Sequence, residues 1–225
     1  MPLRAAVFDF DGVIVDSEPL HFRSLQAALA PEGVVIDEDE YWSVYLAYDD
    51  REAIRLALER HGVPATPEAL ARAASRKVER FAALIPGMPV FPGARELVVS
   101  LAAELPLAIA SGARHDEIEA ILAGLGLRHC FRAVVGAEDA PRTKPDPAPY
   151  LEAARRLADE VPGLGPADCA ALEDSVPGIL SARGAGMRVV GVAHSYPAEK
   201  LRPAHRVVPS LVGLSREDLS ALFAS

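Results

Sequence analysis

The sequence lacks the features that would tie the protein to nucleic acid or to a membrane. Its 225 residues include 23 lysines and arginines against 32 aspartates and glutamates, and the net charge of −9 argues against a nucleic-acid-binding surface. No apolar run reaches the length of a membrane span, and residues 1–15 do not have the layout of a signal peptide. We therefore expect a cytoplasmic, soluble protein that acts without nucleic acid or a membrane.

Cysteine is also scarce. The two cysteines, Cys130 and Cys169, each lie in or beside an apolar run of the kind that forms strands. Cysteine in such a position is commonly a buried free thiol, so we expect two free thiols rather than a disulfide. The sequence has no internal repeat and no low-complexity tract, and 50% of its residues are hydrophobic. A chain of this length can form one large domain, or a core with a smaller insert.

Short apolar runs alternate with helix-like segments over most of the chain. The runs that we expect as strands are 5–8, 107–110, 133–135, 169–172 and 188–192, and the tail 211–223 has a helical pattern. Strands separated by helices predict an α/β fold, a Rossmann-like parallel sheet with helices on both faces. Ligands of such sheets bind beyond the C-terminal ends of the strands.

Residues 16–91 have a different pattern, with helical periodicity and no clear strand. We expect helices after Glu18, over 41–48 and 50–60, and after Thr66, where a proline occupies the first turn. Proline- and glycine-rich breaks at 86–89 and 91–93 end this segment. The sequence therefore predicts a small all-helical domain at 16–91, inserted into an α/β core formed by 1–15 and 92–225.

Two carboxylates follow the first predicted strand. Asp9 and Asp11 are two residues apart, so in an extended chain they point to the same side, and Gly12 permits a sharp turn after them. Two like charges this close need a cation or a shared proton, and Mg²⁺ suits carboxylates that work together with a phosphate. Taken alone, the stretch is equally consistent with an Asp-Gly turn whose acids are solvated.

Polar residues also follow the other predicted strands. Ser111 and Gly112 follow 107–110, Lys144 lies in a proline-rich loop after 133–135, and an acidic pair follows 169–172. Each has an ordinary explanation: a strand-to-helix turn, a solvated loop charge, and a helix N-cap with acids favoured by the helix dipole. The last explanation serves Glu173 especially well. Because several strand ends contribute to one edge of the sheet, we instead expect these residues to form a site together with Asp9 and Asp11.

Together these motifs resemble the haloacid dehalogenase-like superfamily of phosphotransferases, in order and over nearly the whole chain. The matching stretches are Asp9-Phe10-Asp11-Gly12-Val13, Ser111-Gly112, Lys144-Pro145-Asp146 and Glu173-Asp174-Ser175. Residues 11–21, Asp-Gly-Val-Ile-Val-Asp-Ser-Glu-Pro-Leu-His, are most similar to the phosphoglycolate phosphatase and β-phosphoglucomutase-like branch. The helical insert resembles the small cap domain of that family.

The resemblance implies catalytic roles for the core residues. Asp9 would be the nucleophile that forms an aspartyl-phosphate, and Asp11 would protonate the leaving alcohol and later deprotonate water. Lys144 would place a positive charge between Asp9 and the phosphoryl group. The phosphoryl oxygens would be bound by the Ser111 hydroxyl and by the backbone N–H groups of Gly112 and Ala113, which precede a helix.

The resemblance also implies Mg²⁺ as the cofactor and a set of substrate contacts in the insert. The metal ligands would be Asp9, Asp174 and the backbone carbonyl of Asp11, with Glu173 acting directly or through water. The candidate substrate-binding residues of the insert are His21, Arg51 and Lys77. Each has an alternative interpretation: a buried histidine of the core or of a domain interface for His21, a surface charge for Arg51, and a snorkelling side chain for Lys77.

The expected activity is that of a phosphoric monoester hydrolase, a Mg²⁺-dependent phosphatase acting on a small phosphorylated metabolite such as a sugar phosphate. The alternatives are a β-phosphoglucomutase-like mutase and a catalytically silent binding protein on the same fold. Asp16-Ser17 stands where the mutases typically carry Asp-Thr, and Ser111-Gly112-Ala113-Arg114 departs from their Ser-Ala-Ser, which favours the phosphatase. The intact catalytic set argues against a silent protein. We expect a monomer, with a dimer as the alternative.

Overall fold

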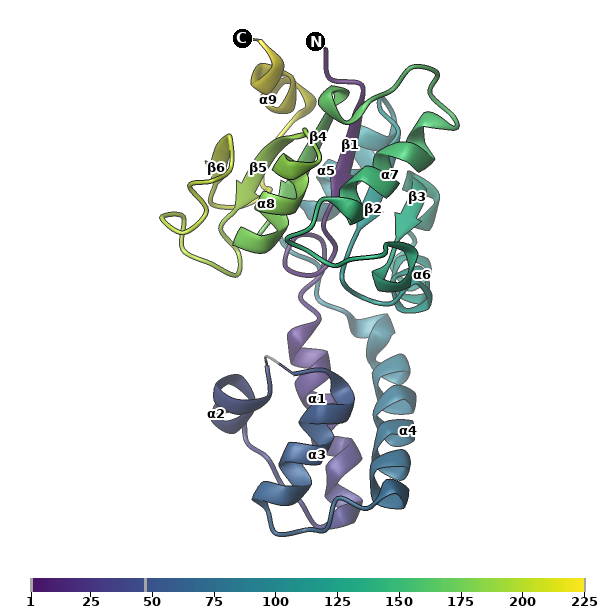
Figure 1. Ribbon diagram of the computed structural model, residues 1–225, viewed down its shortest axis with the longest axis vertical. Helices are drawn as coiled ribbons and strands as arrows, with labels where there is room; N and C mark the ends of the chain where they lie inside the picture. The colour runs from purple at the N-terminus through teal and green to yellow at the C-terminus, as the bar shows by residue number, and fades with distance from the viewer. Residues whose placement is uncertain (1, 47, 225) are drawn as a thin grey trace. The chain divides into compact units, whose positions relative to one another are not determined.

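The structure, a computed structural model, describes residues 2–46 and 48–224, and it divides into two compact units. Ser17–Met88 form a helical unit, and the described residues before and after it form an α/β unit (Figure 1). The insert expected at 16–91 therefore differs from the helical unit by one residue at its start and three at its end. Whether the helical unit acts as a cap stays a prediction, and the two units are described separately below.

A six-stranded parallel sheet forms the centre of the α/β unit, with strand order β3-β2-β1-β4-β5-β6. The strands are β1 (Ala5–Phe8), β2 (Leu107–Ala110), β3 (Phe131–Val135), β4 (Cys169–Glu173), β5 (Arg188–Val192) and β6 (Arg206–Val208). The chain builds outward from β1 to β3 and then returns to β4 on the other side of β1. Ligands of parallel sheets bind where the strand order reverses in this way, which here is the carboxyl end of β1 and β4.

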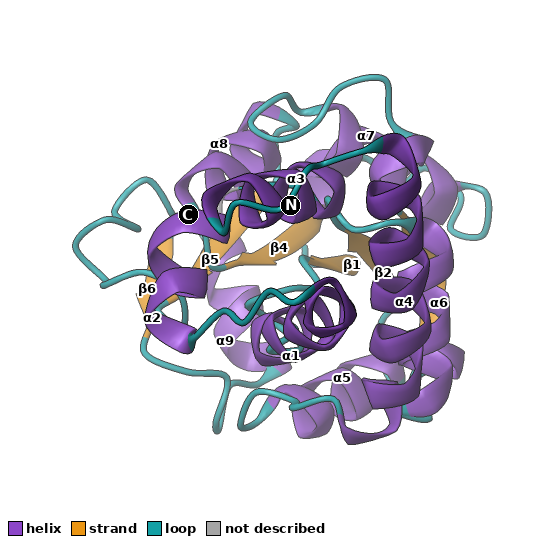
Figure 2. Cartoon of the chain, turned by 90° about the horizontal axis from the view of Figure 1, so that it is seen from below, coloured by secondary structure: helices purple, strands orange, loops and turns teal. Residues whose placement is uncertain are grey.

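Helices cover both faces of the sheet, as the sequence predicts. These helices and that of the C-terminal tail are α5 (Ala94–Ala102), α6 (His115–Gly124), α7 (Ala148–Ala158), α8 (Val176–Gly184) and α9 (Arg216–Ser220). Tyr150 and Leu157 of α7 and Ile179 of α8 are buried with Val7 of β1 in one hydrophobic cluster, while α5 lies on the opposite face (Figure 2). The Rossmann-like fold is therefore confirmed.

The helical unit contains no strand among its described residues. Its helices are α1 (Glu18–Leu29), α2 (Glu38–Glu40), α3 (Asp50–Arg60) and α4 (Pro67–Leu84). The Asp49 side chain caps α3 by accepting from Glu52 N, and the Thr66 side chain caps α4 by accepting from Ala69 N. The apolar faces of α1, α3 and α4 meet in a second buried cluster that includes Leu25 and Ile54. None of the helices in the described part of the chain has both the length and the hydrophobicity of a membrane span.

Short helical turns connect the larger elements. The turns are η1 (Ala30–Glu32), the π-helical η2 (Tyr41–Tyr45), η3 (Ile85–Gly87), η4 (Arg128–Cys130), η5 (Ala137–Asp139), η6 (Pro166–Asp168) and η7 (Ala221–Phe223). The helix expected over 41–48 is thus a single π-helical turn that ends at Tyr45, and Ala47 lies outside the described residues.

The helical bounds expected for the C-terminal tail and the expected set of strands both need correction. The prediction of two free thiols is confirmed. The tail 211–223 is helical only from Arg216, because Gly213 adopts a positive φ of 74° and the Ser215 side chain then caps α9. The sequence pattern also did not indicate β6, which has three residues and lies at the sheet edge with only one of them buried. Cys130 and Cys169 are buried free thiols.

Candidate active site

Asp9 lies directly beyond β1, where the chain leaves the sheet. Its backbone N–H still donates to Leu172 O of β4 at 2.9 Å, which fixes the residue beside the end of that strand. The side chain is buried, and its Oδ1 accepts from Phe10 N at 2.7 Å. Burial, followed by the charges of Glu173 and Asp174, raises the pKa of Asp9 well above its ordinary value, even though Lys144 opposes the rise. An ionised Asp9 therefore needs positive charge close to it.

Lys144 supplies one such charge. Its Nζ lies 2.8 Å from Asp9 Oδ1 and 2.6 Å from Glu173 Oε1, and its side chain is largely buried. Burial alone would lower the pKa of Lys144, but the two carboxylates raise it above its ordinary value, so the side chain is an ammonium. The loop that carries it is anchored to two helices, because Asp146 Oδ1 accepts from Ala148 N at 3.0 Å and Asp146 O accepts from the Ser181 hydroxyl.

Glu173 is fully buried and holds Lys144 in place. Its Oε1 accepts from Lys144 Nζ at 2.6 Å and from the Tyr150 hydroxyl at 2.8 Å. Its Oε2 accepts from Ser175 N at 3.2 Å and from Ser175 Oγ at 3.0 Å. Burial alone would raise the pKa of Glu173, but Lys144 and these hydrogen bonds lower it, so the carboxylate is ionised. Because protein donors occupy both oxygens, the geometry favours a positioning role over direct metal ligation.

The start of α8 is shaped around the same carboxylate. A Cβ placed on Gly178 would lie 1.7 Å from Glu173 Oε1, so any larger residue there would displace the carboxylate. The helix is capped by Ser175, whose side chain accepts from Gly178 N at 3.1 Å. The N-cap interpretation of this stretch therefore applies to Ser175, whereas Glu173 faces the site. Gly178 was not identified from the sequence, since a glycine in a helix carries no sign of the side chain that packs on it.

Asp174 faces the turn that follows Asp9. Burial raises the pKa of Asp174 to about 6, although its hydrogen bond with Ser195 opposes the rise. Gly12 forms this turn with a φ of 77°, and a Cβ on it would lie 2.0 Å from Asp174 Oδ2. Gly12 is therefore required both for its backbone conformation and for the space that Asp174 occupies.

The segment after β5 completes this side of the site. Gly12 O accepts from His194 Nδ1 at 3.0 Å, and the His194 ring stacks on Phe91 with centroids 4.1 Å apart. A Cβ on Gly12 would also lie 2.8 Å from Ser195 Oγ. Neither His194 nor Ser195 was singled out from the sequence. The signal was available, because both follow the end of β5 at Val192 as the other site residues follow their strands.

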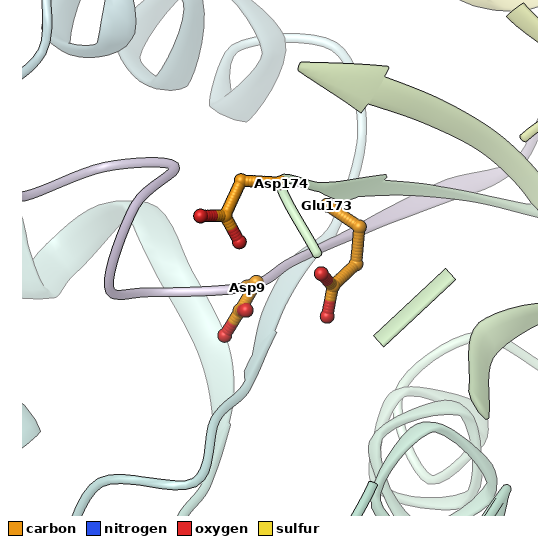
Figure 3. Close-up of side chains that lie close together, drawn as sticks. All are labelled: Asp9, Glu173 and Asp174. Atoms are coloured by element: carbon orange, nitrogen blue, oxygen red, sulfur yellow. The ribbon is translucent and has the colours of Figure 1, made fainter. Parts of the chain in front are cut away.

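Three carboxylates surround a space that suits a hard divalent cation. One oxygen from each of Asp9, Glu173 and Asp174 lies within 4.8 Å of the other two (Figure 3). All three side chains are buried, and burial, followed by the charges of neighbouring carboxylates, raises the pKa values of Asp9 and Asp174. Buried carboxylate oxygens this close together fit a hard divalent cation such as Mg²⁺.

The structure places the remaining core candidates as follows. Asp11 is half-buried in the turn, where its backbone pairs with Val15, and its role as acid and base stays a prediction. Ser111 is buried at the end of β2, and its Oγ accepts from Ala113 N at 3.0 Å. The Ala113 N–H, expected as a donor to a phosphoryl oxygen, therefore already has an acceptor within the chain. Gly112 is exposed beside it.

The helical unit brings two of its three candidates together. Lys77 Nζ lies 2.5 Å from Asp50 Oδ1 and 3.1 Å from His21 Nδ1, and only 3% of Lys77 is exposed. The snorkelling interpretation of Lys77 is therefore wrong, because its ammonium lies inside the unit. His21 stacks on Phe81, with ring centroids 4.5 Å apart. Arg51 is exposed, which agrees with its interpretation as a surface charge, and contact of these residues with a substrate stays a prediction.

Asp50 is the residue that the sequence reasoning missed here. It begins α3, directly before Arg51, where an acid at a helix start has a sufficient explanation in the helix dipole. Its pairing with Lys77 depends on the packing of α3 against α4.

Comparison with known proteins decides the family. The family model of the haloacid dehalogenase-like hydrolases matches this sequence over residues 3–186. The chain belongs to this family. A fructose-1-phosphate phosphatase of Escherichia coli is 33% identical to it over 189 residues, covering 83% of this chain and 94% of the relative. Hexitol phosphatase B of the same organism is 32% identical over 216 residues, covering 95% and 92%.

A solved structure is also similar to this chain over almost its whole length. A variant of CbbY from Rhodobacter sphaeroides, solved in complex with xylulose-(1,5)bisphosphate, has a TM-score of 0.78 and 27% identity, covering 97% of this chain and 99% of that one. The predictions of the family and of a phosphoric monoester hydrolase are therefore confirmed.

Proposed function

We propose that this protein is a Mg²⁺-dependent phosphatase that hydrolyses a small monophosphorylated sugar or polyol through an aspartyl-phosphate on Asp9. The observation that carries the proposal is the buried carboxylate of Asp9 at the end of β1, with the Lys144 ammonium 2.8 Å from its Oδ1. The ammonium lowers the repulsion between the Asp9 carboxylate and an anionic phosphoryl group, and it can stabilise the charge on the phosphoryl oxygens in the transition state. The names of the two phosphatase relatives support a sugar or polyol phosphate as the substrate.

The proposed reaction has two half-reactions at phosphorus. An Asp9 carboxylate oxygen forms a bond to phosphorus while the bond from phosphorus to the ester oxygen breaks, and Asp11 gives the leaving alcohol its proton. Asp11 then accepts a proton from water as the water oxygen attacks the same phosphorus, which releases inorganic phosphate and restores Asp9. Lys144 and the Ser111 hydroxyl stabilise the charge on the phosphoryl oxygens in both steps.

The metal requirement follows from the charge of the site. Asp9, Asp174 and the backbone carbonyl of Asp11 would hold Mg²⁺, while Glu173 keeps Lys144 directed at Asp9. When bound, the cation offsets the repulsion between the anionic nucleophile and the anionic phosphate.

The test measures phosphate release from a generic aryl phosphate and from a panel of sugar and polyol phosphates. We expect turnover that depends on Mg²⁺, stops in excess chelator and is lost in Asp9→Asn while the fold survives. Wild-type turnover by Asp9→Asn, or full activity in chelator with the metal content checked, contradicts the proposal.

The mutase alternative has its own assay. β-Glucose 1-phosphate is supplied with a catalytic amount of the bisphosphate, and both glucose 6-phosphate and inorganic phosphate are followed. A phosphatase releases phosphate in step with consumption of the sugar phosphate. Steady formation of glucose 6-phosphate without matching phosphate release would replace the phosphatase by a mutase.

A further inference from the structure

A pocket of the α/β unit lies at the amino-terminal edge of the sheet, opposite the edge that carries Asp9. Figure 1 shows the start of the chain and the C-terminal tail at this end of the unit. The volume of the pocket is about 500 Å³, which is the size of a small-molecule site. The end of α8, the start of β5, the turns η6 and η7 and the residue before β6 form its wall. Its lining includes Ala167, Arg183, Met187, Arg188, His205 and Phe223.

The described lining of this pocket is cationic, although the chain as a whole has a net charge of −9. Arg183 and Arg188 line it together with His205, and no aspartate or glutamate is among the described lining residues. Arg183 donates from Nη1 to Pro203 O at 2.6 Å, which fixes its guanidinium without neutralising it. Arg188 is half-buried and has neither a hydrogen bond nor an ion pair from its side chain to another described residue.

The acids that are close to the pocket in the sequence are engaged by other residues. Asp168, directly before β4, has its Oδ2 3.6 Å from Arg4 Nη1, and the same oxygen accepts from Gly165 N at 3.0 Å. Asp218 of α9 pairs with Arg206 of β6 at 2.8 Å. The two arginines of the pocket therefore keep a positive charge that no described carboxylate offsets.

His205 is held in the pocket wall by β5. Its backbone N–H donates to Val189 O at 2.9 Å, and its Nδ1 accepts from Val189 N at 3.0 Å. Because Nδ1 is an acceptor, the neutral ring carries its proton on Nε2 and can donate from there. Burial, followed by the charges of Arg183 and Arg188, lowers the pKa of His205, which agrees with two guanidinium groups close to the ring.

Two guanidinium groups, an imidazole N–H and an apolar wall suit an organic phosphate. A phosphate monoester has three acceptor oxygens and up to two negative charges, and guanidinium groups bind such oxygens in pairs. A carboxylate, with two oxygens and one charge, matches three donor groups less well. The buried Met187 and the half-buried Phe223 provide apolar surface for the rest of the ligand.

We propose that this pocket is a second phosphate-binding site, which takes an organic phosphate with an apolar or aromatic body. The site is separate from that of Asp9: Arg188 begins β5, whereas Asp9 follows the end of β1, and the strands are parallel, so the two sites lie at opposite edges of the sheet. The inference does not depend on the proposed phosphatase activity, since the reacting carboxylate takes no part in it.

The test follows methionine methyl signals by NMR in protein labelled with ¹³C at those methyl groups. The structure describes two methionines, Met88 and Met187, and of these only Met187 lines the pocket. The Met187→Leu variant identifies its signal. The probe is phenylphosphonate, which carries a phosphate-like group on an aromatic ring and has a carbon–phosphorus bond in place of the ester. A shift of the Met187 signal reports binding in the pocket itself, whatever binds beside Asp9.

We expect phenylphosphonate to shift the Met187 signal saturably, with a Kd of about 1 mM or tighter. Arg188→Met should weaken this binding about tenfold, because a charge-assisted contact is lost. Arg202→Met removes an exposed arginine of the same unit outside the pocket, and it should keep the wild-type Kd. Inorganic phosphate, which lacks the aromatic body, and benzoate, which lacks the phosphate, should both bind more weakly than phenylphosphonate.

Three outcomes overturn the inference. The first is a Met187 signal that does not move, and the second is an equal Kd in Arg188→Met and the wild type. The third is binding of benzoate as tight as that of phenylphosphonate, which would make the pocket a site for any aromatic anion. A loss in Arg202→Met as large as in Arg188→Met also contradicts it, because the effect would then be one of overall charge. Thermal unfolding by circular dichroism shows whether Arg188→Met is folded, and Arg183→Met is a second variant with the same expected loss.

The result for this pocket is distinguishable from that for the phosphatase. Arg188→Met should release phosphate from an aryl phosphate with the wild-type kcat, because Arg188 lies at the edge of the sheet opposite Asp9. A large fall in kcat would contradict the separation of the two sites. Absence of phosphate release from any tested monoester by the wild type overturns the phosphatase and leaves the binding result for the pocket unaffected.

Discussion

Replacing Lys144 by methionine should destabilise the protein strongly in the absence of divalent cations. Methionine has a similar length and fills the same space, so the change removes the ammonium without opening a large cavity. Asp9 and Glu173 then lose the cation that lies 2.8 and 2.6 Å from them, and both carboxylates are buried. Removing one partner of a buried ion pair typically costs about 3–5 kcal/mol. Against a total stability of about 5–15 kcal/mol, such a loss is easily measured.

Urea unfolding at pH 7 in excess chelator, followed by circular dichroism, measures this loss. Tryptophan fluorescence is less suitable, because the single tryptophan, Trp42, lies in the helical unit. Lys200→Met is the matched control, since Lys200 is exposed and its ammonium lies 5.9 Å from the centroid of the Tyr196 ring. We expect the control to change the unfolding free energy by less than about 0.5 kcal/mol.

Mg²⁺ should return part of the stability that Lys144→Met loses. A cation bound only by the folded state at a hundred times its Kd adds about 2.7 kcal/mol. The kcat of the variant should nevertheless remain about 10²–10³-fold below that of the wild type, because the charge on the phosphoryl oxygens loses a fixed partner. A Lys144→Met protein as stable in chelator as the Lys200→Met control would refute the reasoning, since it would mean that Asp9 and Glu173 do not depend on the ammonium.

Three further predictions concern the turn, the acid and base, and the helical unit. Gly12→Ala should abolish Mg²⁺-dependent turnover, because its Cβ would lie 2.0 Å from Asp174 Oδ2; turnover near the wild-type rate would show that Asp174 can move without consequence. Asp11→Asn should accumulate covalent phosphate on the protein, visible by intact mass, and fast turnover of alkyl phosphates would point to another acid. The contribution of His21 to the unfolding free energy should fall by on the order of 3 kcal/mol as the pH drops from 6.5 to 4, because the unfolded chain protonates His21 below 6.5 and the folded chain only near 4. His21→Phe should remove that part of the pH dependence, and an unchanged slope would contradict the burial of a neutral imidazole.

The sequence was informative about the core of the site because the core follows a simple rule. In a parallel sheet the carboxyl ends of all strands meet at one edge, so a residue that directly follows a strand can be assigned to that edge without knowledge of the packing. Asp9, Ser111 and Asp174 follow their strands in this way. The same rule applied to β5 would also have identified His194 and Ser195.

The roles of other residues were beyond the reach of the sequence. Glu173 and Lys144 are 29 residues apart, and their contact depends on how the loop before α7 is anchored to α7 and α8. The need for a glycine at position 178 exists only because the Glu173 carboxylate occupies the space where a Cβ would lie. A pattern of residue types along the chain does not contain such distances.

The sequence by itself determined the α/β class, the helical insert and the residues at the strand ends, because periodicity and chain order depend on local chemistry. The tertiary structure decided the role and the partners of each charged side chain. Glu173 became the group that positions Lys144, and the buried Lys77 became the partner of the exposed Asp50, 27 residues away. The physical reason is that the protonation state of an ionisable side chain depends on its burial and on its partners, and both arise only when distant segments pack together.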